Sequence, residues 1–169
     1  MLRLNYGFSM FEGLMGMTVF SLMAVTAAPK FFSMQKEYNQ ALIEGLASKV
    51  THAAEVANLQ AIEEGVEQDE FGMLQGFGQL QFGYPSVRIG GLANFVDINM
   101  GYRHTDKPWV WVAHHAVHTN RKDSWLLTRS EWVEHPSRNG ILETQCYIRY
   151  TAPMYLGDRF IVESVTRGC

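Results

Sequence analysis

The chain begins Met1-Leu-Arg-Leu-Asn-Tyr-Gly7, continues directly with Phe8-Ser-Met-Phe-Glu12, and then runs almost without interruption through apolar residues to Pro29. Residues 8–28 carry one charge, on Glu12, and are long enough to cross a hydrocarbon layer of about 30 Å as a helix. A lone carboxylate in such a helix costs about 2.5–3.5 kcal/mol on insertion scales, so it usually has a partner. The stretch therefore predicts a membrane-length helix whose single carboxylate has a specific role.

Two simpler explanations of this segment stay open. A cleaved secretory signal would have an apolar region of about 7–15 residues and a small-residue cleavage site, which Val25-Thr-Ala-Ala28 imitates. The apolar run here is longer, contains Glu12, and continues as a helical pattern beyond Lys30. A plain membrane anchor explains the length of the segment but gives no reason for Gly7 or Glu12.

An amphipathic helix is predicted to continue over residues 33–64. Apolar and small residues recur there at the 3.6-residue period of a helix. This stripe consists of Leu42, Leu46, Val50, Ala53, Ala57 and Ala61. Gly65 is the predicted C-cap. A helix from residue 8 to residue 64 would measure roughly 85 Å, too long for a compact globule of this size, so we expect lipid or other subunits to cover its first half.

Short strands are expected after this helix. They are predicted at residues 79–82, 87–89, 94–98, 107–112, 125–128, 143–151 and 159–165, with a turn at Tyr84-Pro85. In the sixth of these strands, Cys146, Ile148 and Tyr150 alternate with Tyr147 and Arg149. Because no helical patterns separate the strands, the sheet should be mainly antiparallel. The predicted fold class is α+β, with a long N-terminal helix packed on a C-terminal antiparallel sheet.

Composition and charge limit the possible functions. A hydrophobic content of 47% is ordinary for one globular domain with an appendage. The 14 basic and 17 acidic residues give a net charge of −3, which argues against a nucleic-acid binder that depends on bulk positive charge. No nucleic-acid partner is predicted.

The two cysteines are Cys146 and Cys169, the last residue. A disulfide between them would close a loop of about 24 residues and stabilise the fold by roughly 3 kcal/mol. A chain that leaves the cytoplasm can keep such a bond. The terminal position of Cys169 favours the bridge, and two unrelated thiols remain the alternative.

Four histidines form the strongest competing signal: His104, His114, His115 and His118. On a helix, His114 and His118 would share a face and could ligate zinc. The metalloprotease motif is absent, because His115 stands where that motif has its glutamate. The preceding Trp109-Val-Trp-Val112 favours a strand, which would put His114 and His118 roughly 13 Å apart. Surface histidines are therefore favoured over a weak metal site, and a pH-responsive surface is a further hypothesis.

Other residues give weak signals for chemistry. Glu143, Asp158 and Glu163 are too scattered to form a calcium-binding pattern. Ser130 and Ser137 lack a nucleophile-elbow motif, and the chain has no phosphate loop or dinucleotide fingerprint. The four tryptophans are expected in the core rather than on an exposed carbohydrate-binding platform. We predict no enzymatic activity, no catalytic residue, no metal and no cofactor.

The leader, Gly7 and the apolar segment with Glu12 resemble the N-terminus of type IV prepilins. The resemblance implies that a prepilin peptidase cuts after Gly7 and that Phe8 becomes the N-methylated N-terminus. It also implies that Glu12 is the assembly carboxylate, paired with the N-terminal amine of a neighbouring subunit. Pro29 should kink the helix. In the pilin family the helix can loosen on polymerisation between a glycine and a proline, so the resemblance makes Gly16 to Pro29 the candidate stretch here.

Further blocks resemble the mannose-sensitive haemagglutinin (MSHA) pilins of Gram-negative bacteria. They are Ala24-Val-Thr-Ala-Ala-Pro-Lys-Phe31, Gly45-Leu-Ala47, Gly83-Tyr-Pro85, Cys146-Tyr-Ile-Arg-Tyr-Thr151 and Gly168-Cys169. On this resemblance, Cys146 and Cys169 form the bridge that closes the C-terminal loop. The chain departs from the common pattern in the residues that flank Glu12 and in a methionine-rich apolar segment.

The resemblance implies four regions: a leader at 1–7, a transmembrane or filament-core half-helix at 8–32, an amphipathic half-helix at 33–64, and a β domain at 65–169. The expected function is a structural subunit of a type IV pilus for adhesion, surface attachment and motility. Its partners would be other subunits, the prepilin peptidase and the pilus assembly machinery, with the inner membrane before assembly and the cell surface after it. Its receptor is unknown. A minor pilin or type II secretion pseudopilin is one alternative, and a membrane-anchored, histidine-rich metal-binding protein is another.

Overall fold

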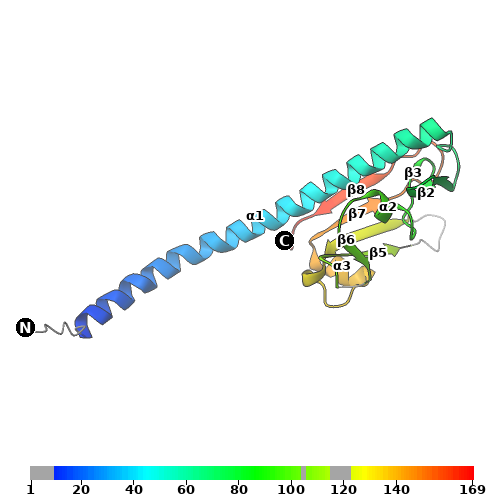
Figure 1. Cartoon of the computed structure of the whole chain (residues 1–169). Coiled ribbons are helices and arrows are strands. Elements are labelled where there is room, and N and C mark those ends of the chain that lie inside the picture. The colour runs from blue at the N-terminus through cyan, green and yellow to red at the C-terminus, as the bar shows by residue number, and fades with distance from the viewer. Residues whose placement is uncertain (1–9, 104–105, 115–122) are drawn as a thin grey trace, which may run out of the picture. The chain divides into compact units, whose positions relative to one another are not determined.

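The computed structural model describes residues 10–103, 106–114 and 123–169, without the side chains of residues 24 and 26–29 (Figure 1). The chain consists of two compact units, Met1–Tyr38 and Asn39–Cys169. The fold is α+β: one long N-terminal helix precedes short strands arranged in two sheets.

Helix α1 spans Met10–Glu64. It ends at Gly65, whose φ of +73° is a left-handed conformation that glycine adopts without a steric penalty. The Val66 amide donates to the Ala61 carbonyl at 2.9 Å, and the Gly65 amide donates to the Ile62 carbonyl at 3.2 Å. This pair of bonds is a Schellman motif, and it satisfies carbonyls that the end of the helix would otherwise leave open. The predicted C-cap is confirmed.

The smaller sheet follows the helix and contains three antiparallel strands, β1 (Gly72–Leu74), β2 (Gly78–Gln81) and β3 (Tyr84–Pro85). The predicted turn at Tyr84-Pro85 is wrong, because these residues form β3. The turn lies immediately before them, where Phe82 and Gly83 both have positive φ. A Cβ on Gly83 would lie 2.8 Å from the side-chain nitrogen of Asn58 on α1, so the tight turn and the close approach to the helix both require glycine there.

The main sheet has the order β4-β5-β6-β7-β8. Its strands are β4 (Met100–Tyr102), β5 (Trp109–His114), β6 (Ser124–Arg129), β7 (Tyr147–Thr151) and β8 (Ile161–Val165). The last four pair antiparallel, as predicted, whereas β4 runs parallel to β5. The sheet is therefore mixed, and the prediction of a mainly antiparallel sheet is confirmed.

Three short helical segments complete the fold: α2 (Leu92–Phe95), the 3-10 helix η1 (Ser130–Trp132) and α3 (Arg138–Thr144). The strands predicted at 87–89 and 94–98 are wrong, because the first region is turn and bend and the second begins inside α2. The strand predicted from residue 143 starts only at Tyr147. Its first residues belong to α3, which ends at Gln145 in a left-handed conformation.

The inner face of the main sheet packs on the second half of α1 (Figure 1). The helix contributes Ile43, Leu46, Val50 and Ala54 to this core, and Ala57 and Ala61 pack on the small sheet. The predicted stripe is right at Leu46, Val50, Ala57 and Ala61. Leu42 and Ala53 are only half-buried, and Ile43 and Ala54 take the central places. The buried stripe is therefore shifted by one residue from the predicted one at these two points.

The outer face of the sheet is covered in part by α3, which packs Ile141 on Val110, Val112, Leu126 and Tyr147. The predicted alternation in β7 is confirmed, since Ile148 and Tyr150 lie in the inner core and Tyr147 in the outer one. The expectation for the tryptophans also holds. Trp111 and Trp125 are buried, and Trp109 and Trp132 are half-buried against the same inner core.

Candidate assembly segment and C-terminal disulfide

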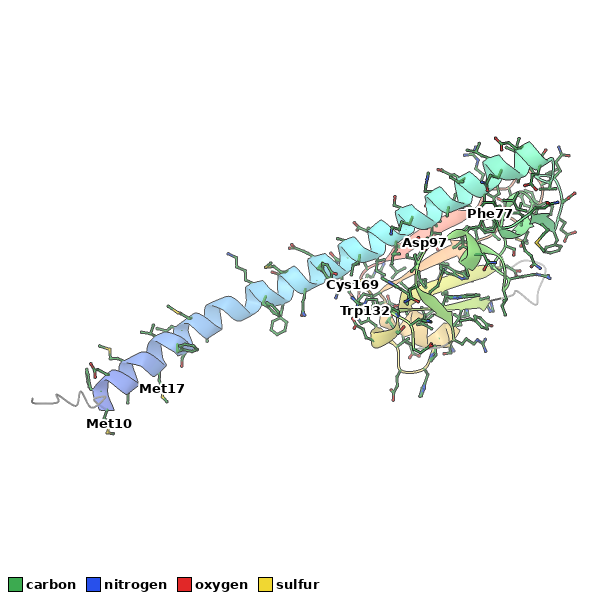
Figure 2. The ribbon with its side chains drawn as sticks, in the orientation of Figure 1. Met10, Met17, Phe77, Asp97, Trp132 and Cys169 are labelled. Carbon is green, nitrogen blue, oxygen red and sulfur yellow. A yellow bond between two sulfur atoms is a disulfide. The ribbon has the colours of Figure 1, made fainter. Side chains whose placement is uncertain are left out.

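The first part of α1, within unit Met1–Tyr38, carries large apolar side chains on every side of the helix (Figure 2). The side chain of Met10 is 91% exposed and that of Phe20 is 78% exposed. Other exposed apolar residues in this segment are Phe11, Leu14, Met15, Met17, Val19, Leu22, Met23 and Val25. At 3.6 residues per turn these positions point in all directions around the axis. A helix that is apolar all round belongs in a membrane or in the interior of a larger assembly.

Glu12 lies in the first turn of α1 and is exposed. The chain has no other charged residue until Lys30. A carboxylate in the first turn interacts favourably with the amides at the N-terminal end of the helix. Gly7 and Phe8, the predicted cleavage point and N-terminus, lie outside the described residues, so the pairing of Glu12 with an N-terminal amine remains a prediction.

Two hydroxyl groups of the apolar segment, both in its described part, bond to their own helix. Thr18 donates to the Met15 carbonyl and Ser21 donates to the Met17 carbonyl, each at 2.8 Å. Hydroxyls bonded in this way do not need water, so they are tolerated in apolar surroundings. The carboxylate of Glu12 is therefore the group of this segment for which an apolar environment is most costly.

Gly13 and Gly16 lie on the same segment, and no contact with the described residues explains why they are glycine. A Cβ built at either position meets no atom within 4 Å. Glycine in a helix interior costs about 1 kcal/mol relative to alanine. Small residues do allow another helix to approach closely, so these two positions suit a contact with a second chain.

Among the residues that the structure describes, no helix is long and apolar enough to cross a membrane. The predicted span at 8–28 includes residues 8 and 9 and the side chains of residues 24 and 26–28, which lie outside that description. Pro29 falls within the bounds of α1, but its side chain is also undescribed, and the predicted kink there remains a prediction.

At the other end of the chain, Cys146 and Cys169 form a disulfide across a sequence separation of 23 residues. The half-cystine at 146 is buried in the inner core at the start of β7. The loop that the bond closes contains β7 and β8. The disulfide thus ties the last residue of the chain to the core of the sheet.

Backbone and side-chain contacts hold the C-terminus against α1 and α3. Asn39 donates to the Cys169 carbonyl at 3.2 Å, and Gln40 donates to the Thr166 carbonyl at 3.3 Å. The Gly168 amide donates to the Gln145 carbonyl at 2.9 Å. A Cβ on Gly168 would lie 2.1 Å from the Thr144 carbonyl oxygen, so any other residue would force the backbone to shift here. The residues Asn39 and Gln40 were not predicted, and their position on a polar helix face gives no signal of this role.

The structure assigns other roles to several residues considered for chemistry. Ser130 donates to the Lys107 carbonyl, and Ser137 is the N-cap of α3, accepting from the Gly140 amide at 3.1 Å. Asp158 accepts hydrogen bonds from the amides of Met154 and Arg159. These contacts stabilise turns and caps.

Of the histidines singled out, His114 lies on β5 opposite Ser124, which confirms that this part of the sequence is a strand. His104, His115 and His118 lie outside the described residues. Within residues 10–103, 106–114 and 123–169, no group of three or more metal-binding side chains comes together. Whether the full set of histidines binds a metal remains a hypothesis.

Comparisons with models of known protein families, with curated proteins and with solved structures find no match to this chain.

Proposed function

We propose that this protein is a type IV pilin, most similar to the mannose-sensitive haemagglutinin pilins, and that it polymerises into a filament used for surface attachment. The observation that carries the proposal is the exposed apolar segment at the start of α1, which contains a single carboxylate. A precursor would bury this segment in the inner membrane, and an assembled filament would bury it among neighbouring subunits.

The energetics of association follow from the segment's composition. Burying apolar surface stabilises an assembly by roughly 25 cal/mol per Å². The ten exposed apolar side chains would therefore supply the larger share of the free energy of association. A buried carboxylate is costly unless it meets an opposite charge. Pairing Glu12 with the N-terminal amine of a neighbour therefore selects one register of association and penalises the others. Gly13 and Gly16 leave room for the neighbour's helix to approach.

The geometry of such a contact supports a filament rather than a closed ring. The proposed amine at Phe8 and the Glu12 carboxylate are four residues apart in the sequence. Neighbours that pack parallel to one another with a shift along the axis would pair the amine of one subunit with the carboxylate of the next, in a head-to-tail manner. Head-to-tail contacts whose rotation does not close generate an open helical assembly.

The disulfide supports a location outside the cytoplasm, because such bonds persist in oxidising compartments. It closes a loop at the end of the globular unit and holds β8 and the C-terminus in place. A subunit exposed on the cell surface gains resistance to unfolding from this bond. The same features fit a minor pilin or a type II secretion pseudopilin, and abundance in sheared surface filaments separates these from a major subunit.

Mass spectrometry of the intact chain from sheared cell-surface material tests the proposal. We expect a chain that starts at N-methylated Phe8 and has a mass two hydrogens below that of the reduced form. A start at Pro29 would identify a cleaved signal peptide and remove the filament proposal. A start at Met1, found only in the membrane fraction, would identify a plain anchor.

A further inference from the structure

Two rows of side chains cross the outer face of the main sheet beside α3. In the first row, His114 pairs with Ser124, Ser124 with Thr151, and Thr151 with Ile161, across strands β5 to β8. These residues line a surface pocket of about 300 Å³. Ser124 and Thr151 are 8% and 9% exposed, so two hydroxyl groups form the floor of the pocket. Ile161 adds an apolar side chain at one edge.

The second row adds charge. Arg149 on β7 pairs with Glu163 on β8, and its guanidinium donates to the Glu163 carboxylate at 3.2 Å. The same guanidinium donates to the Tyr147 hydroxyl at 3.2 Å. Two contacts therefore hold Arg149 in one orientation at the pocket wall before any ligand arrives. An arginine fixed in this way loses little conformational entropy when it binds an anion.

Arg138, the first residue of α3, is the other cationic group of the pocket. Its Nε is buried, and it has no hydrogen-bond partner within the described part of the chain. A buried N–H donor without an acceptor is costly, and such a donor in a pocket is a place for a ligand oxygen. The two guanidiniums against one carboxylate give the lining of the pocket a net positive charge.

We propose that this pocket binds the carboxylate of an acidic sugar unit, such as a uronic acid in an extracellular polysaccharide. The Nε and a terminal nitrogen of Arg138 can donate side by side to the two oxygens of one carboxylate. Ser124 and Thr151 can exchange hydrogen bonds with sugar hydroxyls, and Ile161 can contact the apolar face of the ring. The proposal goes beyond filament assembly, since it concerns a site in the globular unit and holds for a single subunit.

The carboxylate of Glu163 affects which anions the pocket binds. This carboxylate lies in the same pocket and repels a second negative charge. Because the Arg149 guanidinium already pairs with the Glu163 carboxylate, Arg138 leaves the lining with about one net positive charge, which one carboxylate neutralises. A doubly charged phosphate would bring an uncompensated negative charge close to Glu163, so a singly charged carboxylate is favoured. An uncharged sugar can offer the Arg138 Nε only a hydroxyl oxygen, which is a weaker acceptor for a guanidinium than a carboxylate oxygen, so the charged ligand should bind more tightly.

A titration of the oxidised full-length chain in detergent micelles tests this proposal, with the Arg138 Nε–H resonance observed by NMR. The probes are methyl β-glucuronide, the neutral methyl β-glucoside, acetate and inorganic phosphate. We expect the glucuronide to bind with a Kd on the order of 1 mM and to shift the Arg138 resonance. The glucoside and acetate should each bind at least about tenfold more weakly, because each lacks one half of the recognised groups.

The variant Arg138→Gln should weaken glucuronide binding by about tenfold or more, the loss of a hydrogen bond between charged groups. Arg138→Lys keeps the charge but not the paired donors, and should also lose most of the affinity. Arg88→Gln is the matched control, because Arg88 lies over the Phe71 ring and outside the pocket. It should bind as the parent does.

Four results would overturn the proposal. They are no glucuronide binding, equal binding of glucuronide and glucoside, tighter binding of phosphate, and glucuronide binding that Arg138→Gln leaves unchanged. Equal binding of acetate would remove the sugar from the proposal and leave a plain carboxylate site. None of these results bears on filament formation, because the measurement uses dispersed subunits.

Discussion

The hydroxyl of Tyr150 donates a hydrogen bond of 2.7 Å to the carbonyl of Pro85. Tyr150 is fully buried on the inner face of β7, and Pro85 ends strand β3 of the small sheet. The bond therefore joins the small sheet to the main sheet in the interior of the globular unit. Burial, and to a lesser extent the nearby Tyr84, raise the pKa of the Tyr150 hydroxyl well above its usual range.

Replacing Tyr150 by phenylalanine keeps the ring, including its stacking on Phe160, and removes only the donor. The Pro85 carbonyl is then buried without a partner, so we expect a loss of about 1–3 kcal/mol in the free energy of unfolding at neutral pH. Urea unfolding followed by circular dichroism measures this loss. Tyr155→Phe is the matched control, since Tyr155 is exposed, and it should unfold as the parent does.

Comparing the parent with the Tyr150→Phe variant at several pH values tests how the contribution of Tyr150 to stability depends on pH. Because the pKa in the folded state lies above the unfolded value of about 10, the unfolded chain loses its proton first as the pH rises. The parent is therefore expected to lose the contribution of Tyr150 above about pH 10, whereas the Tyr150→Phe variant has none to lose. The difference in stability between the two proteins should shrink from pH 9 to pH 11. A constant difference would contradict the assignment.

Removing the disulfide tests the C-terminal closure. Cys169→Ser opens a loop with a sequence separation of 23 residues, and we expect the stability to fall by roughly 3 kcal/mol in the chain-entropy model. The parent in a strong reductant is the control and should unfold at the same urea concentration as the variant. Equal urea midpoints for the oxidised parent and the variant would mean that the bond contributes nothing to stability.

Substitution by alanine is expected to change the stability in opposite directions at two glycines, Gly168 and Gly45. At Gly168 an added Cβ would lie 2.1 Å from the Thr144 carbonyl oxygen, so the backbone must shift, and we expect a loss of about 1–3 kcal/mol. At Gly45, in the interior of α1, the Cβ meets nothing within 4 Å, and alanine should stabilise the chain by up to about 1 kcal/mol. Thermal unfolding of the two variants should shift in opposite directions. A shift in the same direction would show that the close contact at Gly168 relaxes freely.

Glu12→Ala tests the assembly role of the carboxylate. We expect the precursor to accumulate in the membrane at the parent level while surface filaments are lost, because the register-setting charge is missing. Glu37→Ala is the control, since Glu37 is exposed on α1 and lies outside the apolar segment. For each variant, the amount of sheared surface filaments and the level of precursor in the membrane are measured. Normal filaments from the Glu12→Ala variant would remove this role.

The spacing of apolar residues and the residue that ends a helix allowed much of the fold to be predicted correctly. The helical period of the stripe around Leu46 and Val50 indicated which side of α1 packs on the sheet, and Gly65 marked the end of the helix. The alternation around Ile148 and Tyr150 assigned the two faces of β7. Each of these signals depends on a spacing that the backbone itself imposes, so it is visible in one dimension.

Short elements were missed for a physical reason. Segments α2 and β4 contain four and three residues, too few to show a period. Helix α3 replaced part of a predicted strand because Ser137 caps its start and Gln145 turns its end, and caps are decided by backbone conformation as well as residue type. The pairing of β4 parallel to β5 is a long-range choice that local sequence does not express.

By itself, the sequence determined the long α1, the apolar segment with Glu12 as its single acid, and the presence of two cysteines that could form one bond, Cys146 and Cys169. These are properties of composition and period along one dimension. Only the tertiary structure decided that Asn39 and Gln40 hold the C-terminus, that Tyr150 bonds to Pro85, and that Arg138 and Arg149 share one pocket. Such contacts depend on the register between strands and on the placement of a short helix, which arise when distant segments pack and bury their surfaces together.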